Sequence, residues 1–130
     1  MDLAAMEAEF VRLSRNLDRG LTAMRTAAGE LADAENEYRK AKSQAWVSCP
    51  NDPPSVKAGE REWTAARREA WVNAETADHR KTRDLAEGKR QAAIEAVRSR
   101  RTQISALQTL LNAHQAEASF ARTEPGVKAA

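Results

Sequence analysis

The chain has 130 residues, the size of one domain, with 31% charged and 5% aromatic residues and a mean hydropathy of -0.70. This composition excludes a large globular core, and its excess of Ala, Glu, Arg and Lys is typical of long helices and coiled coils. No stretch approaches the ~20 apolar residues of a membrane helix, which excludes a membrane partner. The single cysteine, Cys49, cannot form an internal disulfide. We therefore expect an all-α protein from a reducing compartment.

Apolar residues recur in alternating steps of three and four through residues 3–47, a heptad seam that predicts one long helix. Large residues line its first half and alanine lines most of its second half, where a partner helix can approach more closely. The spacing lapses only at Gly20. The seam positions are Leu3, Met6, Phe10, Leu13, Leu17, Gly20, Met24, Ala27, Leu31, Ala34, Tyr38, Ala41 and Ala45.

A proline-rich segment at residues 48–55 ends this helix, because proline removes backbone donors and restricts its neighbours. Ser55 is a suitable N-cap for a second helix over residues 56–121. Pro125 and Gly126 indicate a flexible tail over residues 123–130. Two long helices joined by a short loop predict an antiparallel, coiled-coil-like hairpin, within one domain of residues 1–122.

The second helix has a less regular seam, whose phase changes within residues 78–88. This change indicates a stutter or a mild break and leaves open whether the helix is continuous there. With the loop centred near residue 51, Tyr38 would face Trp63 and Phe10 would face Ala92. The second helix would then extend beyond the first and expose an aliphatic cluster. Burying one such side chain stabilises by ~1.5–3 kcal/mol, so the segment either folds back as a third helix or packs against copies of itself. We favour self-association and expect a homo-oligomeric bundle or ring. Its predicted interface is Ile104, Leu107, Leu110 and Leu111.

Catalytic motifs are not evident. His79 and His114 are far apart in the sequence, and no glycine-rich phosphate loop or nucleophile elbow occurs. The carboxylates alternate with Arg and Lys at helical spacing, which is typical of solvated ion pairs. We expect no catalytic residue, no metal and no cofactor, and hence a protein that is not an enzyme.

Residues 79–101 hold eight basic residues and three acidic ones. They either follow the phosphate backbone of a nucleic acid, most effectively when repeated in an oligomer, or pair with acidic residues of the first helix such as Glu9 and Asp18. The candidate nucleic-acid-binding residues are Arg80, Lys81, Arg83, Lys89, Arg90, Arg98, Arg100 and Arg101.

Aromatic residues gather near the predicted loop. Trp46 and Trp71 are candidates for stacking on unpaired bases, with Arg61, Arg67 and Arg68 nearby. The alternative is that these aromatic rings lock the tip of the hairpin by packing over its small residues. The second interpretation is favoured for the whole cluster, and at least Trp63, which is in phase with the seam, should be structural.

The sequence Ala96-Val97-Arg98-Ser99-Arg100, leading into Ile104, Leu107 and Leu111, resembles the UvsY-like recombination mediators of bacteriophages. The layout is also similar, with an N-terminal helix, a polar turn and a long basic helix. The resemblance implies an oligomer that binds single-stranded DNA and assists a recombinase in displacing single-strand-binding protein. It makes Arg98, Arg100 and Arg101 candidate phosphate contacts. The proline-rich turn and the heptad regularity of the first helix depart from that family.

Two functions follow. The first is an oligomeric accessory factor of recombination or replication that binds single-stranded nucleic acid. The second is a coiled-coil adaptor or inhibitor that acts only through protein contacts. The acidic start of the chain lacks the apolar run of a secretory signal, so we expect a cytoplasmic location, in the host cytoplasm if the protein is encoded by a phage.

Overall fold

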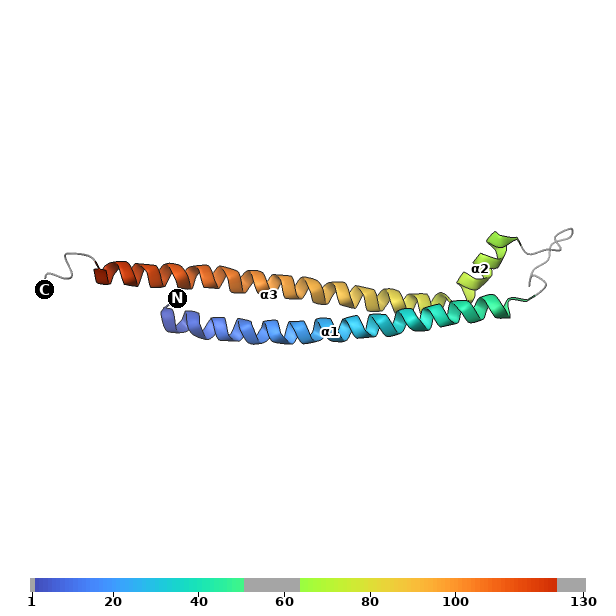
Figure 1. Cartoon of the computed structure of the whole chain (residues 1–130), viewed down its shortest axis with the longest axis horizontal. Helices are drawn as coiled ribbons and strands as arrows, with labels where there is room; N and C mark the ends of the chain where they lie inside the picture. The colour runs from blue at the N-terminus through green and yellow to red at the C-terminus, as the bar shows by residue number, and fades with distance from the viewer. Residues whose placement is uncertain (1, 51–63, 124–130) are drawn as a thin grey trace. The chain divides into compact units, whose positions relative to one another are not determined.

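The computed structural model describes residues 2–50 and 64–123, which form three helices. In chain order these are α1 (Leu3–Ser48), α2 (Ala65–Glu75) and α3 (Ala77–Thr123) (Figure 1). Neither described range contains a strand. The all-α prediction is confirmed.

The helices divide into two compact units. The first unit combines Met1–Arg25 with Ala92–Ala130, and the second unit is Thr26–Gln91. Within each unit, a segment of α1 and a segment of α3 lie side by side and run in opposite directions (Figure 1). The pairing of two long helices, as in a hairpin, is therefore confirmed.

Both helices that follow a non-helical segment begin at a capping side chain. Asp2 Oδ1 accepts a hydrogen bond of 2.7 Å from the backbone N–H of Ala5, which satisfies a donor at the start of α1. Thr64 Oγ1 accepts one of 3.1 Å from Arg67 at the start of α2. The expected cap, Ser55, lies outside the described residues.

The second helical region is interrupted at Thr76, and α3 is continuous through residues 78–88, where the sequence had left open a stutter or a mild break. Thr76 is 2% exposed, and its hydroxyl donates a hydrogen bond of 2.8 Å to the carbonyl oxygen of Val72. The φ and ψ angles of Thr76, -103° and 9°, depart from helical values, so this residue separates α2 from α3. Accordingly, α2 is not collinear with α3 (Figure 1).

The seam predicted for α1 faces the protein interior, since every one of its positions is buried or half-buried. In the first unit it forms an aliphatic core of Leu13 with Leu107 and Leu111. Partly buried side chains pack against this core: Leu3, Met6, Phe10 and Ile104. In the second unit, buried positions are small, including Ala27, Ala45 and Val72.

The predicted pairing register was wrong. Phe10 packs against the core that contains Leu107 and Leu111 rather than against Ala92, and Tyr38 contacts Arg83. Its expected partner, Trp63, lies outside the described residues. The chain between the two long helices includes α2 and is longer than the assumed loop at 48–55, so a later part of the chain pairs with α1.

Because of this change in register, α1 covers most of the aliphatic cluster of α3 that was expected to be exposed. Leu107 and Leu111 are 6% and 7% exposed, whereas Leu110 is 56% exposed. The physical argument for an oligomer interface therefore no longer applies to Leu107 and Leu111, and it is weakened for half-buried Ile104. Self-association through Leu110 stays a prediction.

Candidate functional site

The eight basic residues predicted to contact phosphates differ in exposure. Arg83, Arg90 and Arg100 are half-buried at positions of α3 that continue the heptad spacing of Val97, Ile104 and the other core residues. The remaining five are exposed: Arg80, Lys81, Lys89, Arg98 and Arg101.

Arg100 is fitted into the seam of the first unit. Its Nη1 donates a hydrogen bond of 2.7 Å to the backbone oxygen of Asn16. A Cβ at Gly20 would overlap Arg100 Nη1 and would lie 3.3 Å from Val97 Cγ2. The glycine that interrupts the apolar spacing of α1 therefore provides the space for a guanidinium group. The sequence signal that could have predicted this contact is a glycine at a seam position of α1 together with an arginine at a seam position of α3.

Arg83 is held in the seam of the second unit. Its guanidinium carbon lies 4.6 Å from the centroid of the Tyr38 ring, a cation–π arrangement. Its Nη2 and Nε donate to Asp84 Oδ1 at 2.9 and 3.2 Å. The hydrogen bond with Asp84 is the largest cause that raises the pKa of Arg83. Arg83 therefore makes both of these contacts within the second unit.

Four of the exposed cations form no ion pair within the described residues: Arg80, Lys81, Arg98 and Arg101. Arg98 and Arg101 are adjacent on one turn of α3. Lys89 Nζ lies 3.7 Å from Glu30 Oε2, with both side chains well exposed. Acidic residues such as Glu87 and Glu95 interrupt the basic sequence along α3. The local positive charge is therefore discontinuous.

The two tryptophans proposed for base stacking differ in exposure. Trp46 is 40% exposed near the end of α1, and Trp71 is half-buried on α2, beside the fully buried Val72. Burial of Val72 and Thr76 shows that the α2–α3 junction is packed. The base-stacking function of Trp46 and Trp71 stays a prediction.

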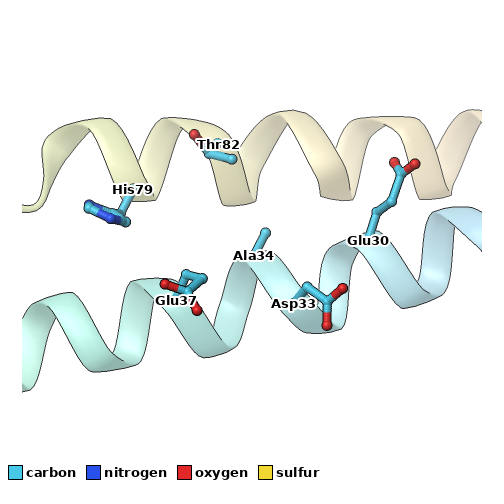
Figure 2. Close-up of a pocket in the computed structure, with 6 residues that line it drawn as sticks. All are labelled: Glu30, Asp33, Ala34, Glu37, His79 and Thr82. Carbon is cyan, nitrogen blue, oxygen red and sulfur yellow. The ribbon is translucent and has the colours of Figure 1, made fainter.

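A lateral groove flanks the seam of the second unit. Its main cavity of about 390 Å³ is lined by Glu30, Asp33, Ala34, Glu37, His79 and Thr82 (Figure 2). A cavity of about 370 Å³ extends it along α3 to Leu85, Ala86 and Lys89. We call this surface the acidic groove, because three of its side chains are carboxylates.

The first unit has a groove of its own. Its cavity of about 380 Å³ is lined by Leu13, Leu107 and Leu110, with Glu9 and Arg12 on the α1 side and Gln103 and Ala106 on the α3 side. Arg12 donates a hydrogen bond of 2.9 Å from Nε to Glu9 Oε2. This hydrogen bond is the largest cause that lowers the pKa of Glu9. The pair is a surface ion pair.

The described side chains were also compared with what a metal site or an acid–base site requires. Within residues 2–50 and 64–123, no group of three or more His, Cys, Asp and Glu side chains could hold a metal ion. His79 borders the acidic groove but is exposed, as are Glu30, Asp33 and Glu37 (Figure 2). These groups lack the desolvated setting that tunes a catalytic acid or base.

No protein-family model matches the chain, and neither a curated protein nor a solved structure is significantly similar to it. None of the helices, as far as the structure describes them, contains an apolar segment long enough to cross a membrane.

Proposed function

We propose that the chain is a non-enzymatic coiled-coil adaptor or inhibitor that acts by binding another protein. One observation carries this proposal: each lateral groove contains a large aliphatic side chain that its own unit leaves exposed. Leu85 is 63% exposed in the acidic groove, and Leu110 is 56% exposed in the groove of the first unit. An exposed leucine in a groove between two helices gains burial when a further helix packs there.

The positions of the arginines favour this function over nucleic-acid binding. Arg83 stacks on the Tyr38 ring across the helix pair and donates to the exposed Asp84. Arg100 donates to the backbone oxygen of Asn16, and Arg90 is half-buried at a seam position of α3. Phosphate binding requires cations that solvent and ligand can reach. The predicted set of phosphate contacts is thereby reduced to its exposed members.

Photo-crosslinking tests the protein-binding function. A photoreactive phenylalanine analogue is introduced separately at Leu85 and Leu110, and at the exposed polar residues Gln91 and Thr102 as controls. Irradiation in the producing cells should yield a discrete protein adduct from a groove position and none from the control positions. An equal pattern of adducts from all four positions, or none from either leucine, would contradict the proposal.

Single-stranded nucleic-acid binding is the second candidate function, and exposed Arg98 and Arg101 favour it. The partners would then be single-stranded DNA and, as the UvsY-like resemblance implies, a recombinase or single-strand-binding protein. Binding to a labelled oligonucleotide should weaken steeply with salt, with a logarithmic slope of about 0.7 per phosphate neutralised.

The matched controls for this candidate lie on α1 of the same unit. Arg98→Ala/Arg101→Ala should reduce both the affinity and the salt slope, whereas Arg15→Ala/Arg19→Ala, with the same change in charge, should affect them less. Equal affinities for the two double variants would reject Arg98 and Arg101 as the binding site.

A further inference from the structure

The acidic groove presents three carboxylates along one side of α1. Glu30, Asp33 and Glu37 follow each other in steps of three and four residues and therefore lie along one helical face. In Figure 2, Glu30 extends from α1 towards α3, and Ala34 lies between the two helices. The cavity is thus bordered by negative charge on α1 and has small side chains at its base.

These carboxylates are weakly engaged by the chain itself. Glu30 Oε2 lies 3.7 Å from Lys89 Nζ, and Glu37 Oε1 lies 3.8 Å from Lys40 Nζ, in pairs that are mostly exposed to solvent. Asp33 forms no ion pair with any described residue. Long, exposed ion pairs contribute little, so cations from another molecule can replace them at small cost.

The opposite side of the acidic groove supplies an apolar anchor. Leu85 is 63% exposed on α3, and its neighbours in the cavity include Ala34 and Ala86. Alanine allows helix axes to approach closely, and an exposed leucine beside it gains burial when another helix docks. Acidic and apolar features therefore occur along one groove, in two cavities that share Glu30, Ala34 and Thr82.

We propose that the acidic groove binds a basic amphipathic helix of a partner protein. Lysine or arginine residues spaced by three and four on that helix would match the spacing of Glu30, Asp33 and Glu37, and its apolar face would cover Leu85. The charge complementarity selects this occupant over a nucleic acid, whose phosphates the three carboxylates repel. This proposal rests on the protein-binding function and assigns it a surface and a class of partner.

The probe is a synthetic amphipathic helix built from repeats of Leu-Ala-Lys-Leu-Ala-Lys-Lys, with a control peptide in which glutamate replaces each lysine. Fluorescence anisotropy with the full chain should show binding of the lysine peptide and none of the glutamate peptide. Asp33→Lys/Glu37→Lys should weaken binding by roughly tenfold or more, as expected when complementary charges become repulsive. Leu85→Gln should weaken it while leaving the exposed charges unchanged.

The matched control is Glu35→Lys/Glu87→Lys, which makes the same change in net charge in the same unit but outside the residues that line the acidic groove. It should retain most of the affinity, and circular dichroism should show that all variants remain helical. Equal weakening by the two double variants, or equal binding of the two peptides, would overturn the proposal. So would an unchanged affinity for Leu85→Gln.

Sedimentation of the chain alone gives a further outcome. A dimer that Leu85→Gln dissociates would show that a second copy covers the acidic groove, and this result would also overturn the proposal. Failure of the acidic-groove proposal can be distinguished from failure of the protein-binding function. A crosslinked protein at Leu110 with no peptide binding at Leu85 would retain that function and reject the acidic groove as its surface.

Discussion

Gly20 and Arg100 occupy complementary positions in the first unit, because the guanidinium group fills the space that a Cβ at residue 20 would require. Arg100 Nη1 is held there by the backbone oxygen of Asn16 at 2.7 Å. A seven-residue shift in pairing would place Arg100 near a seam position such as Leu13, without that space. A polar contact of this kind can specify helix register at some cost in stability.

Substitutions at glycine should therefore depend on position. Gly29→Ala should stabilise the fold by about 0.5–1 kcal/mol, because alanine is the better helix former and a Cβ there meets no atom within 4 Å. Gly20→Leu should destabilise it by about 1–3 kcal/mol through overpacking and displacement of Arg100. Urea unfolding followed by circular dichroism measures both.

A double-mutant cycle tests whether Gly20 and Arg100 are coupled. The combination Gly20→Leu/Arg100→Ala should be less destabilising than the sum of the two single changes, because the displaced guanidinium is absent. Additive effects would show that the two residues act independently and that register is specified elsewhere.

The three leucines near the end of α3 should respond differently to truncation. Leu107→Ala and Leu111→Ala should each cost about 2–5 kcal/mol, because both side chains are buried in the core of the first unit. Leu110→Ala should cost much less, since its side chain is 56% exposed. Similar losses at all three positions in thermal unfolding would indicate that Leu110 is also covered, as in an oligomer.

The buried hydroxyl of Thr76 should contribute measurably at the α2–α3 junction. Thr76→Val keeps the shape but removes the 2.8 Å hydrogen bond to the Val72 oxygen, which should cost about 0.5–1.5 kcal/mol. Thr82→Val is the matched control, because Thr82 Oγ1 makes the same kind of bond to Asp78 at an exposed site. Chemical unfolding should show a smaller loss for the control, and the opposite order would contradict the structural assignment.

Glu9 should titrate below its ordinary pKa of 4.5, because Arg12 donates a hydrogen bond to its carboxylate. The depressed pKa means that the pair stabilises the fold above pH 4.5 and loses this effect as the pH falls through the folded-state value. The stability effect is small because the site is exposed. Carboxyl NMR should show the Glu9 pKa rising in Arg12→Ala but not in Arg15→Ala.

The sequence predicted α1 well and α3 poorly, for a physical reason. Apolar residues mark almost the whole seam of α1, so its periodicity could be recognised directly. On α3, Arg83, Arg90 and Arg100 occupy seam positions. Arginine can pack its aliphatic stem in a seam while its guanidinium finds polar contacts, but its sequence signal is that of a surface residue. These arginines were consequently assigned to a phosphate-binding face.

The pairing register of α1 and α3 also could not be predicted from the heptad pattern. A heptad seam is compatible with shifts of seven residues, and the choice depends on contacts such as Arg100 with Gly20 and on how much chain separates the helices. The acidic groove was missed because Glu30 and Asp33 are distant in sequence from His79 and Leu85. Only the register brings these four residues to two cavities that share Glu30, Ala34 and Thr82.

The change from large to small seam residues along α1 implies uneven resistance to local opening. Leu13, Leu107 and Leu111 bury extensive aliphatic surface in the first unit, whereas Ala27 and Ala45 contribute one methyl group each in the second. Backbone amides around Ala34 should therefore exchange with deuterium sooner than those around Leu13. The acidic groove lies in the second unit, where the seam is weakly packed. A helix docked there would therefore slow amide exchange most at the positions that are least protected in the isolated chain.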